Sequence, residues 1–507
     1  MKKPSRWRES TLSAALAVVG ALVWSACHGR EPTPWLGWVA LVPLILLLGR
    51  RRIALWGWLY GVVLWLGSMS WIAATLESYG GLSPGLSWFV QGLLCLYLGF
   101  DQMVFAVLGQ RIWRHGGAAV FWALPALWVA IEWLRGVAFG RFPWNLAAHA
   151  WVDLPGALPL AAWIGAFGVS FILFFANVCV AESVRRQRWE PAVVGLLASL
   201  TLIVLAGRFG GAVEPDSIGG RRSGRQVVLI QPNSSIVQNW EESWEHYNRL
   251  ITLSEAECGN ARVPTERRLL IWPESAAWPH SYPTSQRLRQ DVARLASMGC
   301  DVLLGSQINE GQDAYNSVLL VSAEGPAGRY SKRKLVPWGE YVPLADVLPF
   351  MGRVARNAGD FTPGTSLGLL SWSGEQIAMA ICYEVIFAGH VAQQVQAGAS
   401  VLVTVTNDAW YGDTAAPHQH FRAAQFRAAE NRRPMLRAAL TGISGLIDRR
   451  GHVSARLGVG ERGVLRGRIT GSTELSPYSR APWLVPGLCT LLAALGLVRS
   501  WRPRRVA

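Results

Sequence analysis

The sequence predicts an α-helical transmembrane bundle of eight spans joined to a layered α/β domain, and three observations predict this fold class. Hydrophobic residues make up 51% of the 507 positions, and the mean hydropathy is +0.23. These values are too apolar for a soluble globule and too polar for a helix bundle alone. Long apolar segments flank one hydrophilic block, residues 209–480, in which short β-rich runs alternate with helical patterns.

Eight apolar segments account for the membrane part. They lie at about 10–27, 34–49, 53–75, 85–110, 117–135, 157–181, 191–208 and 482–498. The second is short for a span, which needs about 20 residues. With a cytoplasmic N-terminus, the inside segments hold sixteen Lys and Arg residues and the short outside segments and span ends hold four. The positive-inside rule then puts both termini in the cytoplasm and residues 209–480 outside it.

We therefore expect a membrane domain at 1–208, an exported domain at 209–480, and an eighth span with a basic cytoplasmic tail at 481–507. The net charge of +15 divides unequally, with +3 on residues 209–480 and +12 on the rest. Because the basic residues belong to the membrane part, nucleic acid is not an expected partner. The N-terminus resembles a lipoprotein signal ending at Cys27, but Trp24 is a poor fit, and we expect a retained span.

The cysteines predict no metal site, because no CxxC or Cys/His spacing occurs. Four lie in or beside apolar segments and are most simply apolar fillers: Cys27, Cys95, Cys179 and Cys489. The exported block holds an odd number, Cys258, Cys300 and Cys382, so one must stay free or pair with another molecule. Cys258 and Cys300 either form a disulfide or are both dispensable.

The hydrophilic block predicts alternating strands and helices after a Gly-, Ser- and Arg-rich linker at 209–225. Strands are expected at 227–230, 269–272, 302–304, 318–321, 377–381, 401–405 and 445–447. Helices are expected at about 241–257, 284–298, 389–397 and 418–432. This alternation favours a layered α/β domain, although periodicity alone does not give the strand order.

Three short stretches in this block bring a carboxylate, a thiol and an ammonium close to strand ends. A lone cysteine is usually structural, but Cys382 directly follows a strand-like run, Glu384 lies two residues on, and the polar stretch 407–412 follows the next strand. A thiol with an ordinary pKa near 8.5 needs a base or a nearby cation to act as a nucleophile. Glu274 can supply the base and Lys332 the cation.

Both partners also have plainer interpretations. Glu274 could be a surface carboxylate, but Pro273 and the neighbouring aromatic residues indicate a desolvated turn, which would raise its pKa. Lys332 lies in a cationic run that is typical of a solvated face, yet the apolar segment 335–339 follows it. A fixed ammonium there would stabilise the oxyanion of an acyl-transfer intermediate.

These residues, with 407–412 and the flanking spans, resemble the apolipoprotein N-acyltransferases, a membrane-embedded family of the nitrilase superfamily found in the bacterial inner membrane. The resemblance implies that the exported domain is a nitrilase-like αββα sandwich. It implies Glu274 as general base, Lys332 as oxyanion stabiliser and Cys382 as nucleophile. The supporting positions it implies are Glu340, Tyr383 and Glu384, with Trp240 on a mobile loop near the lipid entrance.

The family resemblance also implies the reaction. A phospholipid acylates the cysteine, and the thioester then passes its acyl chain to the α-amine of S-diacylglyceryl-cysteine in an apolipoprotein, without a cofactor or metal. A lipid donor must enter from the bilayer, because exposing tens of CH₂ groups costs about 0.8 kcal/mol each. The apolar stretch 347–351, with Phe350 and Met351, is therefore a lid or else a packed loop, and Trp338 is a further gating position.

Two departures from the family pattern stand out. Lys334 occupies the position where the family commonly has His, and Ala439 and Leu440 replace a common Thr-Asn pair.

Two other functions stay open. A membrane-tethered nitrilase-like amidase would use the same three groups with water as acceptor, and a transporter or scaffold would use the intramembrane Asp101 or Glu132.

Overall fold

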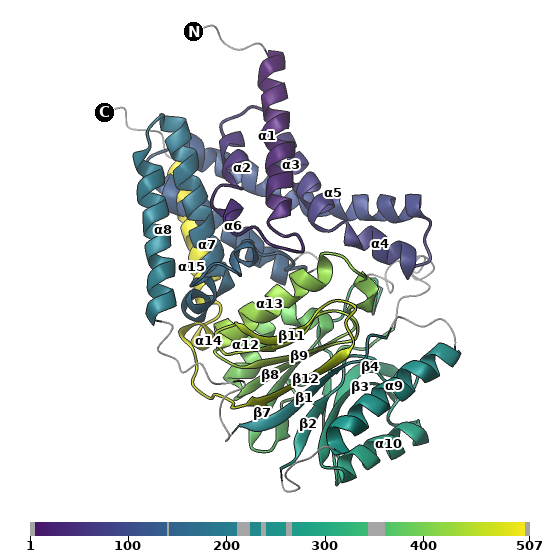
Figure 1. Cartoon of the computed structure of the whole chain (residues 1–507). Helices are drawn as coiled ribbons and strands as arrows, with labels where there is room; N and C mark the ends of the chain where they lie inside the picture. The colour runs from purple at the N-terminus through teal and green to yellow at the C-terminus, as the bar shows by residue number, and fades with distance from the viewer. Residues whose placement is uncertain are drawn as a thin grey trace. The chain divides into compact units, whose positions relative to one another are not determined.

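The computed structural model describes residues 6–138, 141–209, 218, 224–234, 240–259, 266–342 and 360–501. The chain forms two compact units, which are described separately (Figure 1). Unit 1 comprises Met1–Ala212, Thr414–Arg422 and Ala481–Ala507. Unit 2 comprises Val213–Asp413 and Ala423–Arg480.

Unit 1 is helical. Its helices are α1 (Arg6–Ala26), η1 (Leu36–Trp38), α2 (Val42–Leu47), α3 (Ile53–Ser68), α4 (Trp71–Ser78), α5 (Pro84–His115), α6 (Ala119–Val137), η2 (Ala147–Trp151), α7 (Ala157–Arg186), α8 (Glu190–Phe209) and α15 (Leu484–Trp501). Within the described residues, six helices are long and apolar enough to cross a membrane, and a seventh crossing results if α3 and α4, bent by 53°, form one span. The protein is thus a multi-helix membrane protein, as the sequence predicted.

The predicted short span at 34–49 is a broken helix, η1 followed by α2. Asn177 of α7 satisfies the backbone groups that the break exposes. Its amide nitrogen donates to the carbonyl of Gly37 at 2.8 Å, and its amide oxygen accepts the Leu41 N–H at 2.9 Å. Because backbone groups in an apolar environment must find partners within the protein, this buried Asn allows the interruption.

Residues 414–422 also belong to unit 1, which the sequence did not predict. They include the first turns of α13 (Ala416–Asn431). Gln419 uses all four hydrogen-bonding positions of its amide. The nitrogen donates to the carbonyls of His28 and Ser68, and the oxygen accepts the indole N–H groups of Trp71 and Trp144. This segment is therefore fixed to unit 1 by buried polar contacts.

Unit 2 contains two six-stranded sheets. Their orders are β12-β1-β2-β3-β4-β5 and β11-β10-β9-β8-β7-β6. The strands of the first sheet are β1 (Arg225–Gln231), β2 (Arg268–Ile271), β3 (Cys300–Glu310), β4 (Asp313–Ser322), β5 (Gly325–Ser331) and β12 (Gly463–Ile469). Those of the second are β6 (Leu370–Trp372), β7 (Glu375–Ile381), β8 (Val401–Thr406), β9 (Met435–Ala439), β10 (Ser444–Ile447) and β11 (Val453–Leu457). The central strands β1–β2–β3 and β7–β8–β9 run parallel.

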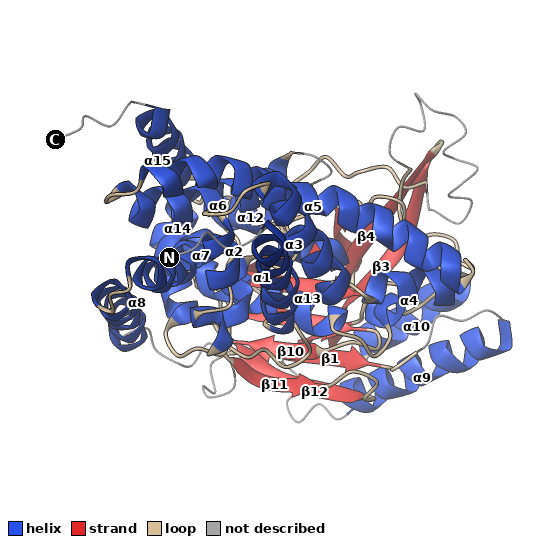
Figure 2. Ribbon diagram, turned by 90° about the horizontal axis from the view of Figure 1, so that it is seen from above, coloured by secondary structure: helices blue, strands red, loops and turns tan. Residues whose placement is uncertain are grey.

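Side-chain alternation along the strands builds the layers. Val227 and Leu229 of β1 join a core shared with residues of the second sheet, whereas Val228 and Ile230 join a core with α9 (Trp240–Gly259) and α10 (Gln286–Ser297). Both helices lie beside the first sheet (Figure 2). Helix α12 (Ala388–Gln396) packs against β7 and α14 (Pro477–Arg480). The two facing sheets with outer helices form the layered α/β arrangement that the sequence predicted.

A disulfide joins α9 to the start of β3. Cys258 and Cys300 are bonded, with their Cα atoms 5.8 Å apart. Both residues lie in the core between the first sheet and its helices. Of the two alternatives that the sequence left open, the bonded one is confirmed.

Candidate active site

Glu274 lies just beyond the end of β2 and is almost fully buried, with 6% of its surface exposed. Its Oε1 accepts a hydrogen bond from Asn316 Nδ2 at 2.7 Å, and its Oε2 accepts the Asn407 N–H at 3.0 Å. Burial raises the pKa of Glu274, the nearby Lys332 opposes this, and Glu340 adds to it. A carboxylate held in this way has the raised pKa that a general base requires.

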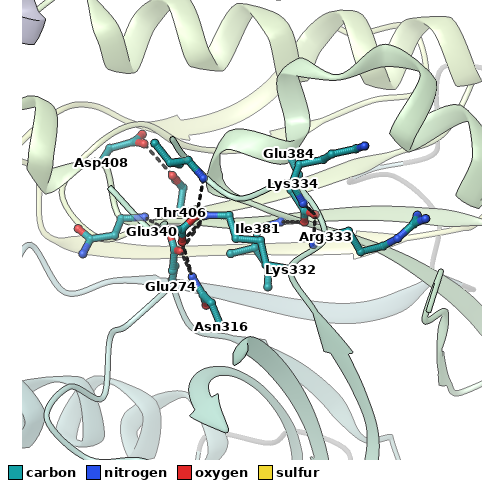
Figure 3. Close-up of polar contacts among 12 residues, drawn as sticks. Glu274, Asn316, Lys332, Arg333, Lys334, Glu340, Ile381, Glu384, Thr406 and Asp408 are labelled. Carbon is teal, nitrogen blue, oxygen red and sulfur yellow. Dashed lines mark hydrogen bonds and ion pairs between the residues drawn. The ribbon is translucent and has the colours of Figure 1, made fainter. Parts of the chain in front are cut away.

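Lys332 directly follows β5 and is buried, with its ammonium between two carboxylates. Its Nζ lies 2.8 Å from Glu340 Oε1 and 3.6 Å from Glu274 Oε1 (Figure 3). Burial alone would lower the pKa of Lys332, but Glu340, Glu274 and Cys382 together raise it above its ordinary value. The ammonium therefore stays charged, as stabilisation of an oxyanion requires.

Glu340 completes the polar cluster. Its Oε1 accepts from both Lys332 Nζ and Asn316 Nδ2, and its Oε2 accepts the Val336 N–H at 2.8 Å. Asn316, in the middle of β4, thus bridges the carboxylates of Glu274 and Glu340. Sequence reasoning missed Asn316, although an Asn inside a β-rich run, where Asn is uncommon, is a usable signal.

Cys382 is the first residue after β7, and its backbone is in the left-handed region with φ of +50°. Such a conformation is strained for a side chain with a Cβ and is often found at functional sites. Only 6% of the residue is exposed. Burial, with smaller contributions from Glu274 and Asp408, raises the pKa of the thiol to about 12, and Lys332 and a hydrogen bond with Thr406 act in the opposite direction. The charges of Glu274 and Lys332 therefore act directly on this sulfur.

Glu384 holds the backbone around the site. Its Oε1 accepts the N–H groups of Arg333 and Lys334 at 2.7 and 3.0 Å, and its Oε2 accepts the Ile381 N–H at 2.8 Å. The Tyr330 hydroxyl donates to the same carboxylate at 2.9 Å. This fully buried carboxylate thus links the segment carrying Lys332 to the turn carrying Cys382 (Figure 3).

The remaining predicted positions differ in their surroundings. Tyr383 is buried and packs edge-on against Phe387. Lys334 donates its backbone N–H to Glu384, so the two lysines of the cationic run are distinguished by burial and partners. Trp338 is 47% exposed on a tight turn, with φ of +66°. Trp240 begins α9, but its side chain, and the whole of Phe350 and Met351, lie outside the described residues.

The acidic residues of the transporter hypothesis have structural partners. Asp101 accepts from Arg135 Nη1 at 3.4 Å, and Glu132 Oε1 accepts the Ala147 N–H at 2.7 Å. Across the part of the chain that the structure describes, no group of three His, Cys, Asp or Glu side chains could hold a metal ion.

Comparison with known proteins decides the family. The family model for the apolipoprotein N-acyltransferase N-terminal domain matches residues 19–179, and that for carbon-nitrogen hydrolases matches residues 226–477. An apolipoprotein N-acyltransferase of Geobacter metallireducens is 33% identical over 93% of this chain and 92% of its own length. The chain belongs to the apolipoprotein N-acyltransferase family. A Methylococcus capsulatus apolipoprotein N-acyltransferase is 31% identical over 92% of this chain and 93% of its own length.

Membership in the apolipoprotein N-acyltransferase family makes this chain an acyltransferase. Solved structures of the nitrilase superfamily are also similar to part of this chain. An amidase from Nesterenkonia AN1 is 19% identical over 53% of this chain and 99% of its own, with a TM-score of 0.40. A Saccharomyces cerevisiae protein from branch 10 of the superfamily is 15% identical over 56% of this chain and 97% of its own, with a TM-score of 0.37.

Proposed function

We propose that the chain transfers a fatty acyl group from a phospholipid to the α-amine of S-diacylglyceryl-cysteine at the start of an apolipoprotein. The acyl group passes through a thioester on Cys382. The observation that carries this proposal is the cluster of the buried Glu274 and Lys332 with the partly buried Glu340. Glu274 and Lys332 act electrostatically on the Cys382 thiol, in a chain of this family. These are the groups that nucleophilic acyl transfer needs.

In the first half-reaction, Glu274 removes the thiol proton while the sulfur attacks the ester carbonyl of the phospholipid. Lys332 stabilises the oxyanion, and Glu340 and Asn316 hold Lys332 and Glu274 in place. The C–O bond then breaks. Protonated Glu274 returns the proton to the departing alkoxide, which leaves as a lysophospholipid.

In the second half-reaction, the acceptor amine attacks the thioester. The free α-amine has an ordinary pKa near 8, so part of it is uncharged at neutral pH. Glu274 accepts the proton that the attacking nitrogen loses, and the C–S bond breaks to release the thiolate. The same proton then passes to the sulfur, which restores the resting enzyme and leaves an amide on the lipoprotein.

The proposed topology follows the charge asymmetry of the sequence. Residues 1–208 form a membrane domain, 209–480 the periplasmic catalytic domain, and 481–507 the last span and a cytoplasmic tail. Eight crossings require the broken segment η1–α2 and the bent pair α3–α4 each to count as one. Reaction of thiol-directed, membrane-impermeant reagents with single cysteines introduced at exposed sites in intact cells would test the assignment of each side.

The donor is expected to enter from the outer leaflet, past Trp240, Trp338 and the apolar stretch with Phe350 and Met351. Replacing Phe350 and Met351 with Asp should slow acylation by bilayer phospholipid much more than alkylation of Cys382 by a small water-soluble reagent. Equal losses in both assays would contradict the lid hypothesis and point to a folding defect.

The decisive experiment detects the acyl-enzyme. Purified protein is incubated with phosphatidylethanolamine vesicles without acceptor, and the peptide containing Cys382 is examined by mass spectrometry. We expect a fatty acyl adduct that hydroxylamine removes and that a synthetic diacylglyceryl-cysteinyl peptide discharges as an amide. Cys382→Ser should show neither adduct nor turnover. Wild-type turnover in that variant would refute the nucleophile, and discharge to free fatty acid alone would indicate a hydrolase.

A further inference from the structure

Three buried polar side chains lead away from the thiol. They are Thr406, Asp408 and Arg437, and each is at most 1% exposed. None of the three is needed to describe the acid, base and oxyanion groups of the site. Buried polar groups of this kind require partners, and their partners form one continuous chain of hydrogen bonds.

The sheet register places the first member of this chain beside the nucleophile. Strands β7 and β8 are parallel, and Ile381 pairs with Val405. The next residues, Cys382 just after β7 and Thr406 at the end of β8, therefore lie side by side at the carboxyl ends of the two strands. The Thr406 side chain hydrogen bonds to Cys382, and its hydroxyl also lies 2.7 Å from Asp408 Oδ1, to which it donates.

Asp408 is fixed in place from the other side. Arg437 Nη2 lies 2.7 Å from its Oδ2, and both side chains are fully buried. The guanidinium is held in turn by the carbonyl of Ile443, to which its Nε donates at 3.0 Å. A Cβ at Gly442 would clash with the Asp408 side chain, so the absence of a side chain at this position leaves room for the carboxylate. The Thr406 hydroxyl proton is consequently the part of the chain that can change partner.

A threonine hydroxyl has one proton to donate and two acceptor lone pairs. While Cys382 is a thiol or a thioester, the Thr406 hydroxyl can keep donating its hydrogen bond to Asp408. Once Glu274 takes the thiol proton, the buried thiolate needs a donor, and rotation of the hydroxyl supplies one. We propose that Thr406 is a positioning residue whose hydroxyl donates its hydrogen bond alternately to Asp408 and to the Cys382 thiolate. Arg437 neutralises the charge of Asp408.

The alternation adds no proton to the reaction and removes none. The hydroxyl donates to sulfur when the S–H bond breaks, and returns to Asp408 when the C–S bond forms. It donates again when the thioester breaks and the thiolate leaves. Lys332 faces the sulfur as a positive charge, and Glu274 and Asp408 face it as negative charges. The phenols of Tyr383 and Tyr411 lie close by, and burial raises the pKa of each well above its ordinary value, so they stay neutral.

The test rests on the proposed nucleophile but does not use its turnover. The rate of Cys382 alkylation by iodoacetamide at pH 8 is measured by mass spectrometry on the full-length protein in detergent. Because pH 8 lies far below the pKa of about 12, this rate is proportional to the small thiolate fraction. A hydrogen bond to a charged group corresponds to roughly 10- to 100-fold in that fraction. Thr406→Val should therefore be about 10- to 100-fold slower, and Thr406→Ser should retain most of the rate.

Two further variants separate this role from a general packing effect. Thr404 is a buried threonine two residues before Thr406 on β8. Thr404→Val is therefore a matched control, and Cys382 in this variant should be alkylated at the wild-type rate. Asp408→Asn removes a negative charge from beside the sulfur and weakens the competing acceptor. It should alkylate about tenfold faster, the opposite sign to Thr406→Val.

The outcomes are distinguishable. A wild-type rate in Thr406→Val, or a slower rate in a normally melting Asp408→Asn, would overturn the proposal. If Asp408→Asn unfolds because Arg437 loses its partner, the alkylation rates of Thr406→Val and Thr406→Ser still test the proposal. An inactive Cys382 in the acyl-enzyme experiment, together with these alkylation differences, would refute the proposed function and leave the coupling to Thr406 intact.

Discussion

Replacement of Lys332 by Met should remove turnover and lower stability together. The ammonium is 1% exposed and lies 2.8 Å from Glu340 and 3.6 Å from Glu274. Removing one partner of a buried ion pair leaves an uncompensated charge and costs about 3–5 kcal/mol. Loss of an oxyanion donor costs about 100-fold or more in turnover. Lys334→Met is the matched control, because it changes a partly exposed lysine two residues away whose backbone makes the contact with Glu384.

The assay pairs thermal unfolding with single-turnover acylation of Cys382 by phospholipid. We expect Lys332→Met to lose both, and Lys334→Met to be mild in both. Adding Glu340→Gln to Lys332→Met removes one uncompensated carboxylate and should restore part of the stability without restoring acylation. Recovery of acylation in the double variant would show that Lys332 only balances charge. A larger loss from Lys334→Met than from Lys332→Met would refute the assignment of the oxyanion lysine.

Three further predictions follow from the described contacts. Because burial raises the pKa of Glu274, single-turnover acylation should fall as the pH drops through a midpoint above 4.5, and a midpoint at or below 4.5 would contradict a desolvated base. Reducing the Cys258–Cys300 disulfide, whose cysteines are 42 residues apart, should lower the free energy of unfolding by about 4 kcal/mol in the chain-entropy model, measured by denaturant titration with and without reductant. Glu384→Ala leaves three backbone N–H groups without their carboxylate, at about 1–3 kcal/mol each, so unfolding at a much lower temperature is expected, and an unchanged melting temperature would contradict the linking role.

The sequence predicted those strands whose own residues favour β structure and missed those that depend on their neighbours. The apolar runs of β1, β2, β7 and β8 were all found. In contrast, β5 is Gly- and Pro-containing and is held by its antiparallel pairing with β4. Strand β12 contains two glycines and two arginines, and only its pairing with β1 reveals that Leu465 and Ile469 face the core.

The site could be predicted as far as strand ends and no further. Carboxyl ends of adjacent strands meet at one edge of a sheet, so the positions of Glu274, Cys382 and 407–412 followed from local pattern. The contacts of Asn316 and Arg437 could not follow, because each depends on a partner more than 20 residues away in the chain. The effect of the change at Ala439 and Leu440 also depends on the folded structure. The Ala439 N–H donates to Ser444 Oγ, and the Leu440 N–H donates to the Thr406 carbonyl.

Burial of this site has two opposed consequences for acyl transfer. In the proposed mechanism it keeps bulk water from the thioester on Cys382, which favours attack by an amine that is brought to the site over hydrolysis. It also raises the pKa of the thiol to about 12, so that the resting thiolate fraction near neutral pH is only about one in ten thousand or less. Every unit of difference between the pKa values of thiol and base adds about 1.4 kcal/mol to proton transfer.

The polar neighbours of the sulfur act against that second consequence. The raised pKa of Glu274 reduces the difference between the pKa values of the base and the thiol. The charge of Lys332 and the hydrogen bond with Thr406 lower the pKa of the thiol, which reduces the same difference. Arg437 limits the opposing effect of Asp408 by pairing with it. A site that excludes water must supply its own solvation for the charge that forms during the reaction, and in the proposed mechanism Lys332 and Thr406 supply it for the thiolate.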